Sequence, residues 1–203
     1  MEPDKPHTVN EPDIESGYYS YADSLTWEIP ELVELIRGKV YKKSLTAPPR
    51  IHQSAVGQLT YRLYSYCIGK GLEVYNGPLD VRLPDTESKD DKDIFNVVQP
   101  DVLVVSDKSK LDDIGCMGAP DFVAEILTGK NHRLELIEKF NLYQDHHVKE
   151  YWVILPESQL VQKYTLVGNK YQSSQLLTSG DVVESAVIEG FKLDLEEFFG
   201  DVE

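Results

Sequence analysis

Two carboxylates lie in apolar segments that have the pattern of buried strands. Glu125 falls inside the run 122–127, and Asp101 opens the run 102–105. A buried carboxylate is costly unless it is paired, protonated or bound to a metal. Carboxylate oxygens suit Mg²⁺, which keeps water ligands that a substrate phosphate can replace. The pair predicts a metal site of Asp101 and Glu125, and with it a hydrolase of phosphate esters.

The spacing of strands favours a shared position for these acids. Side chains alternate between the two faces of a strand, so Glu125 shares a face with Val123 and Leu127. Asp101 lies on one face of its own strand with Leu103. If the two strands pair, both carboxylates point to the same side. A lysine nearby would orient an attacking water and offset developing negative charge.

Each acid also has a structural interpretation that the residues leave open. Glu125 could form a buried ion pair with an arginine, and the candidates are Arg37, Arg62 and Arg133. Asp101 could cap backbone amides in a turn. The strand context of Glu125 favours chemistry over structure, and the two acids together favour it further.

Composition places the chain among ordinary globular proteins. It has 203 residues, of which 41% are hydrophobic and 27% charged, enough for one domain with a sizeable core. The net charge is -15, but residues 1–30 carry -6 and residues 181–203 carry -7. The remaining segment, 31–180, carries -2. Binding to nucleic acid is therefore expected to be weak or assisted by a partner, because a broad basic surface is missing.

The sequence predicts a cytoplasmic protein. No apolar stretch approaches the roughly 20 residues that a membrane-spanning helix needs. The first ten residues lack the basic and apolar parts of a secretion signal. Cys67 and Cys116 stand far apart, outside any metal-binding spacing, and are interpreted as reduced thiols.

The chain divides into a flexible acidic N-terminal arm over residues 1–24 and one domain over residues 25–200. Apolar periodicity and the placement of Pro and Gly predict an α/β fold, with a mixed sheet flanked by helices. We expect helices over about 29–37, 52–68 and 133–145, and strands over about 39–42, 72–75, 79–83, 99–105, 120–127 and 150–155. A hairpin over 159–176 and a final strand and short helix over 191–199 follow.

An ordered set of short motifs resembles a known family. The motifs are Glu34-Leu-Ile-Arg-Gly-Lys-Val-Tyr41, His52 at a helix start, Val81-Arg-Leu-Pro84, Val98-Gln-Pro-Asp-Val102, Gly118-Ala-Pro-Asp-Phe-Val-Ala-Glu-Ile-Leu127, Lys139 with Tyr143, and Glu150-Tyr-Trp-Val153. Together they resemble the large bacterial family of predicted restriction endonucleases in the PD-(D/E)XK nuclease superfamily. The resemblance runs from about residue 32 to residue 164.

This resemblance implies a restriction-endonuclease-like fold and cleavage of DNA phosphodiester bonds that depends on Mg²⁺ or Mn²⁺. Asp101 and Glu125 match the two acids that hold the metal. The lysine of the superfamily motif is absent, because Leu127 stands two residues after Glu125. The resemblance implies that this lysine has moved to the following helix, where Lys139 stands. The family also implies products with 5′-phosphate and 3′-hydroxyl ends.

Other residues have assisting or alternative roles. Glu34 could complete the metal site from the first helix, and His52 could contact phosphate or water. Lys130 is the reserve candidate for the catalytic lysine. Without the resemblance, Lys139 would be interpreted as a surface partner of Glu135 one turn away.

A pair of histidines and a small basic patch are two further groups of side chains that could bind a ligand. The adjacent histidines His146 and His147 do not share a helix face and are not interpreted as a metal site. Lys42, Lys43 and Arg50 form a small basic patch that could meet DNA phosphates, or equally a solvated loop.

Three functions stay open. The first is a metal-dependent endodeoxyribonuclease, expected to act as a homodimer because cleavage of both strands takes two sites. The second is a catalytically inactive nuclease fold that serves as an interaction or regulatory module, which the acidic charge and Leu127 favour. The third is a metal-dependent hydrolase of a small phosphate ester.

Overall fold

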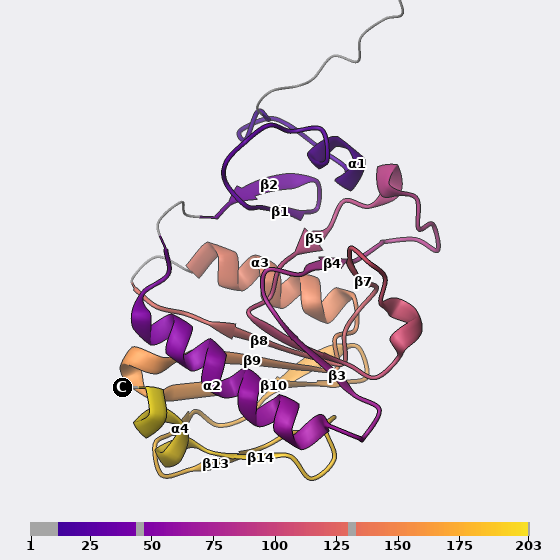
Figure 1. The fold of residues 1–203 in the computed structure, drawn as a ribbon. Helices are drawn as coiled ribbons and strands as arrows, with labels where there is room; N and C mark the ends of the chain where they lie inside the picture. Colours follow the sequence, from indigo (N-terminus) through magenta and orange to yellow (C-terminus); the bar gives the residue numbers. More distant parts are fainter. Residues whose placement is uncertain (1–11, 44–46, 130–132, 203) are drawn as a thin grey trace, which may run out of the picture.

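The structure, a computed structural model, describes residues 12–43, 47–129 and 133–202 (Figure 1). Its strands form a five-stranded sheet, a seven-stranded sheet and a two-stranded sheet. The two larger sheets each contain one parallel pair among antiparallel ones. The mixed α/β fold expected from the sequence is confirmed. The helices are α1 (Tyr21–Ser24), α2 (Arg50–Cys67), α3 (Arg133–Asp145) and α4 (Leu195–Val202).

The seven-stranded sheet is the larger framework. Its order is β11-β10-β9-β8-β6-β3, with β12 paired to β10. Its strands are β3 (Glu73–Asn76), β6 (Val102–Val105), β8 (Phe122–Ile126), β9 (Glu150–Leu155), β10 (Leu160–Val167), β11 (Lys170–Ser173) and β12 (Leu177–Thr178). β8 and β9 run parallel and are connected through α3, while β6 runs antiparallel to β8.

The five-stranded sheet lies toward the N-terminal part of the molecule, and the small sheet toward the C-terminal part (Figure 1). The strand order of the five-stranded sheet is β2-β1-β5-β4-β7. Its strands are β1 (Val33–Ile36), β2 (Lys39–Lys42), β4 (Asp80–Arg82), β5 (Val97–Val98) and β7 (Gly115–Met117), and the small sheet pairs β13 (Val182–Glu184) with β14 (Lys192–Asp194).

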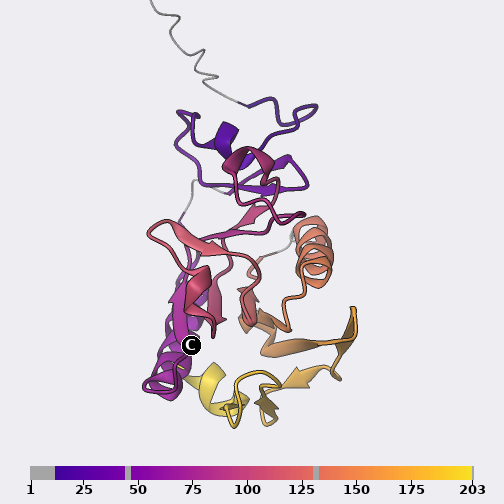
Figure 2. The same ribbon diagram turned by 90° about the vertical axis from the view of Figure 1, so that its right-hand side faces the viewer.

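The two long helices lie on opposite sides of the seven-stranded sheet, α2 on one and α3 on the other (Figure 2). α2 buries Ala55, Leu59 and Leu63, which recur every four residues and so form one stripe. This stripe packs with Val102, Val104 and the even-numbered residues of β8. The odd-numbered residues, Val123 among them, face α3. The alternation predicted for the two acid-bearing strands is therefore confirmed, and it places Glu125 on the α3 side.

The first expected helix, over residues 29–37, is wrong. Val33–Ile36 is strand β1, and it pairs antiparallel with β2. Arg37 and Gly38 form the connecting turn with φ of 51° and 73°, a left-handed pair that a two-residue hairpin requires. Gly38 therefore belongs to the turn of a β-hairpin and does not follow a helix. A strand of four residues is too short for its alternation of apolar and polar side chains to be recognised in the sequence.

The end of the expected acidic arm makes contacts with the rest of the chain. Tyr21 is buried together with Leu35, Ile94 and Val97, and its hydroxyl donates to Asp80 Oδ2 at 2.9 Å. The division into an arm over residues 1–24 and a domain over residues 25–200 stays a prediction, and residues 1–11 lie outside the described residues.

Candidate active site

A lysine joins two buried glutamates where the two larger sheets meet. Lys139 Nζ of α3 lies 3.0 Å from Glu34 Oε1 of β1 and 3.0 Å from Glu125 Oε1 of β8. All three side chains are at most 7% exposed. Three elements from distant parts of the chain thus meet in one charged cluster. Glu34 enters it from a strand, where the sequence analysis placed it on a helix.

Asp101 joins the cluster from the edge of the neighbouring strand. It lies one residue before β6, at the position that the β6–β8 register sets opposite Glu125. Its Oδ2 accepts a hydrogen bond of 2.7 Å from the backbone amide of Ile126. The structural interpretation of Asp101 as a cap of backbone amides therefore holds in part. That bond also fixes the carboxylate next to Glu125.

His52 reaches Asp101 from the first turn of α2. Its Nε2 lies 3.4 Å from Asp101 Oδ1. Its other ring nitrogen, Nδ1, is buried and has no hydrogen-bond partner among the described residues. A buried ring nitrogen without a partner is costly in an apolar setting and is a feature of sites that bind a further group. The sequence analysis expected His52 at this site, and the structure places it there.

Tyr143, which the sequence analysis named beside Lys139 without a role of its own, contacts Glu125. It lies four residues after Lys139 on the same face of α3, and its hydroxyl donates to Glu125 Oε1 at 2.8 Å. Lys139 and Tyr143 therefore both donate to Oε1, and no hydrogen bond within the described residues ends on Oε2 of Glu125. The spacing of four on a helix was the signal available in the sequence.

Lys43 is a second cation beside the cluster. Its Nζ lies 3.2 Å from Glu34 Oε1 and donates to the carbonyl of Gln99 at 2.8 Å. The amide of Gln99 donates in turn to Glu34 Oε1 at 2.7 Å. Glu34 Oε1 thus accepts hydrogen bonds from Lys139 and from the Gln99 amide, and it forms an ion pair with Lys43. Lys43 is 31% exposed, so it lies at the edge of the cluster, as expected for part of the basic patch.

The carboxylates differ in their affinity for protons. Burial raises the pKa of Glu125, and although Lys139 opposes this, Asp101 and Glu34 add to it and bring the pKa to about 7. Burial alone would also raise the pKa of Glu34, but Lys139, Lys43 and the Gln99 amide hold it below its ordinary value. Burial acts likewise on Asp101, where His52 and the Ile126 amide lower the pKa. Glu125 is therefore the carboxylate of the cluster that takes up a proton near neutral pH.

Two of the three arginines considered as partners of Glu125 pair with other acids. Arg37 pairs with Asp145 at 2.9 Å and Arg62 pairs with Asp201 at 2.6 Å. The side chain of Arg133 lies outside the described part of the chain, as do Lys130 and the side chain of Glu135. The buried ion pair of Glu125 is real, but its partner is Lys139.

The two adjacent histidines diverge, as expected. His146 Nε2 lies 3.2 Å from Asp85 Oδ1, whereas His147 Nε2 lies 3.3 Å from Asn169 Oδ1. They point to different neighbours and do not converge on one point.

The donor set of the cluster fits a magnesium ion in its chemistry. Asp101 and Glu125 offer hard carboxylate oxygens, and Mg²⁺ is commonly held by one or two carboxylates with water and phosphate completing its shell. Within the ranges that the structure describes, no group of three or more His, Cys, Asp and Glu side chains is arranged as a metal cage.

The sequence matches the profile of one known protein family over most of its length. The profile of the Uma2 family, described as "Putative restriction endonuclease", matches residues 23–196. The chain belongs to this family. The Uma2 match covers every element of the cluster, from β1 to α3, and confirms the family resemblance found in the sequence motifs.

A solved structure shares the fold. It is that of a putative nuclease belonging to DUF820 from Anabaena variabilis ATCC 29413, with a TM-score of 0.70, 16% sequence identity, and coverage of 91% of this chain and 99% of that chain. At this identity the likeness shows the fold alone, and it confirms the fold expected for a Uma2 protein. No curated protein matches the chain. Within the described ranges, no helix has the length and apolarity to cross a membrane.

Proposed function

We propose that this Uma2 protein hydrolyses DNA phosphodiester bonds with Mg²⁺ or Mn²⁺ as cofactor. The observation that carries the proposal is the contact of Lys139 with Glu34 and Glu125, next to Asp101. A lysine and acids from four segments, buried together, are the groups that phosphodiester hydrolysis requires. The relocated lysine, expected from the family resemblance, is the residue that completes this set.

Asp101 and Glu125 are the residues that would hold the metal ion. When bound, the ion would polarise a phosphoryl oxygen and lower the pKa of a water molecule. The pKa of Glu125, about 7, leaves its carboxylate available to a cation at neutral and higher pH. Protons and the metal would therefore compete for Glu125.

Lys139 would supply positive charge to the reacting phosphate. Its ammonium group donates to Glu34 and Glu125 in the present structure. Its positive charge would stabilise the attacking water or a phosphoryl oxygen, where negative charge develops. The water would attack phosphorus in line with the leaving 3′-oxygen.

Glu34 and Tyr143 would act as positioning residues. Glu34 holds Lys139 from the side opposite Glu125, and Tyr143 fixes Glu125 through Oε1. This leaves Oε2 of Glu125 as the oxygen directed to other ligands. His52, whose Nε2 lies beside Asp101, would hold that carboxylate and contact phosphate or water through its buried, unpartnered Nδ1.

The test is cleavage of supercoiled plasmid by the purified protein with Mn²⁺ or Mg²⁺. We expect nicked and linear products that vanish in chelator, and a loss of about 100-fold or more in Glu125→Gln and Lys139→Met. Glu150→Gln is the matched control, because Glu150 is a buried glutamate on the neighbouring strand β9 that binds Trp152 and the 185–187 segment. It is expected to keep activity.

Equal, faint cleavage in all of these proteins would contradict the proposal. It would favour the inactive nuclease fold as an interaction module, which the net charge of -15 supports. Turnover of a phosphodiester dye without DNA cleavage would favour a hydrolase of small phosphate esters. The homodimer and the cytoplasmic location stay predictions, and sedimentation of the active protein tests the first.

A further inference from the structure

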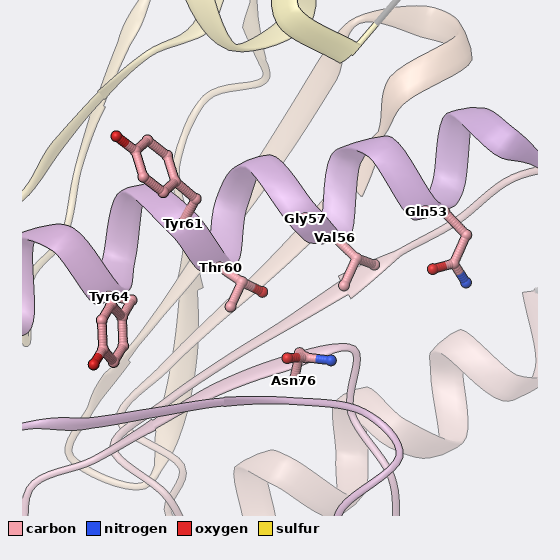
Figure 3. Close-up of a pocket in the computed structure, with 7 residues that line it drawn as sticks. All are labelled: Gln53, Val56, Gly57, Thr60, Tyr61, Tyr64 and Asn76. Carbon is pink, nitrogen blue, oxygen red and sulfur yellow. The ribbon is translucent and has the colours of Figure 1, made fainter.

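A hollow with a volume of about 370 Å³ lies along the exposed side of α2, beside the candidate active site. Gln53, Val56, Thr60 and Tyr64 point from α2 toward the side of the hollow where Asn76 ends strand β3 (Figure 3). Tyr61 also lines the hollow, but it points away from that side. The volume lies within the range of small-molecule pockets, about 300–1,000 Å³.

Two residues of the lining are sequence neighbours of residues that contact Asp101. Gln53 follows His52, whose ring contacts Asp101 Oδ1 at 3.4 Å. Asn76 precedes Gly77, whose amide donates to the backbone carbonyl of Asp101 at 3.0 Å. The hollow therefore lies near the segment that carries the acid proposed to hold the metal, although Asp101 itself does not line it.

No residue of the lining carries a charge. The lining combines amide, hydroxyl, aliphatic and aromatic groups. It therefore suits an occupant with an uncharged, flat or apolar face and polar edges. Tyr64 is 56% exposed, and within the described residues its ring stacks on no other aromatic ring and its hydroxyl makes no hydrogen bond. Such a ring is a platform for a nucleobase.

Gly57 supports an occupant that approaches the helix closely. It lies in the middle of the 18-residue helix α2, and a Cβ added there would meet nothing within 4 Å. Glycine in a helix costs about 1 kcal/mol relative to alanine, and nothing within the described part of the chain requires it here. Its effect is to keep the floor of the hollow open.

We propose that this hollow, defined by Gln53, Val56, Gly57, Thr60, Tyr64 and Asn76, is a subsite for an unstacked nucleobase of the DNA strand. The proposal rests on the proposed nuclease function and names its substrate more closely. The base stacks on Tyr64, and the amides of Gln53 and Asn76 meet its polar edge. A strand with an unpaired base near the scissile phosphate is then preferred over regular duplex, because a paired base cannot leave the stack without cost.

The first test measures binding without cleavage. Fluorescein-labelled oligodeoxythymidylate and an abasic strand of equal length are titrated with full-length Glu125→Gln protein, and anisotropy is recorded. We expect the base-containing strand to bind more tightly. Tyr64→Leu and Gly57→Leu, added to that background, should weaken binding of the base-containing strand by about 5- to 150-fold, while Tyr64→Phe should keep it. Neither change should alter binding of the abasic strand.

Gly200→Leu is the matched control, because Gly200 is a helical glycine in open space on α4. Equal binding of the base-containing and abasic strands, or no effect of Gly57→Leu, overturns the subsite. Loss through Gly57→Leu accompanied by a halved molar mass in sedimentation also overturns it, because the hollow would then serve a second copy of the chain.

Cleavage by the otherwise unaltered protein separates this inference from the proposed function. Cleavage of both strands at the same rate, with equal binding, leaves the nuclease standing and overturns the subsite. Selective binding of the base-containing strand without cleavage by any metal supports the subsite and overturns the nuclease.

Discussion

At the scale of single residues, the site depends on how one lysine is shared. Lys139 lies 3.0 Å from Glu34 and 3.0 Å from Glu125, and each of these carboxylates receives other donors as well. Removing two like charges from water is costly, and one ammonium group cannot neutralise both in full. The deficit falls on Glu125, whose pKa rises to about 7, whereas Glu34 keeps a pKa below its ordinary value. Uptake of a proton at Glu125 removes the excess negative charge.

The raised pKa of Glu125 makes stability depend on pH. Between pH 4.5 and about pH 7 the folded protein holds a proton that the unfolded chain releases, so the stabilisation present at low pH is lost as pH rises. Glu125→Gln removes this dependence. Its free energy of unfolding, relative to the unaltered protein, should rise by about 3 kcal/mol between pH 4.5 and about pH 8. Urea denaturation over this pH range measures it, and a difference that stays constant with pH would contradict it.

Loss of the shared lysine should cost far more than loss of a surface lysine. Lys139→Met leaves two buried carboxylates without their common cation and should lower the free energy of unfolding by about 3–5 kcal/mol. Lys149→Met is the control, since Lys149 is 62% exposed in its pair with Asp121, and it should cost about 0–1 kcal/mol. Urea denaturation at pH 8 compares the two. Equal losses would show that the cluster is no more buried in solution than the surface pair.

At the scale of elements, helices and strands present the site residues from different sides. β8 and β6 set Glu125 and Asp101 at neighbouring positions, α3 brings Lys139 and Tyr143 one turn apart, and the β1–β2 hairpin brings Glu34. α2 packs its buried stripe on the far side of the sheet and presents His52 at its first turn. Each element contributes through its rigid geometry, because the side chains themselves have few alternatives once buried.

Helix α2 should become more stable when its open glycine is filled. Gly57→Ala removes backbone freedom from the unfolded chain and adds a Cβ that meets nothing within 4 Å, so stability should rise by about 0.5–1 kcal/mol. Gly190→Ala is the opposite case, because Gly190 has φ of 77° and a Cβ there would lie 2.6 Å from the Tyr66 hydroxyl. It should destabilise. Thermal denaturation measures both, and a loss of stability in Gly57→Ala would show that the helix needs its glycine.

At the scale of the whole molecule, the negative net charge disfavours nonspecific binding of nucleic acid. The chain carries -15, and both terminal segments are acidic. The cations near the site, Lys42, Lys43 and Arg50, are the small patch available to phosphates. Repulsion by the remaining surface lowers the rate of encounter with DNA and leaves discrimination to short-range contacts.

This distribution predicts a shallow dependence of DNA binding on salt. If Lys42, Lys43, Arg50 and Lys139 meet phosphates, the slope of log K against log salt concentration should be about -4 or shallower. Arg50→Ala should reduce the slope by about 1. Lys170→Ala, on β11 at the sheet edge opposite β3, should leave it unchanged. Anisotropy titrations with duplex DNA on the Glu125→Gln background measure the slopes. A slope several times steeper would reveal a wider basic surface.

The sequence by itself determined the parts of this protein that follow from local patterns. Helices α2 and α3 show apolar residues at helical spacing, and the strands around Asp101 and Glu125 show alternation, so both acids were placed on one face correctly. The ordered motifs carried the family and the fold. Each of these patterns involves residues that are close in the sequence, so the local geometry of a helix or strand is sufficient to predict them.

Only the tertiary structure decided how these parts meet. Glu34 and Lys139 are separated by 105 positions in the chain. The sequence pattern predicted a helix for the segment that carries Glu34, whereas its pairing with β2 makes it a strand. The orientation of Tyr143 toward Glu125, the raised pKa of that acid and the hollow between α2 and Asn76 likewise arise from contacts between distant segments. Burial and pairing depend on which elements pack together, and no local pattern encodes that.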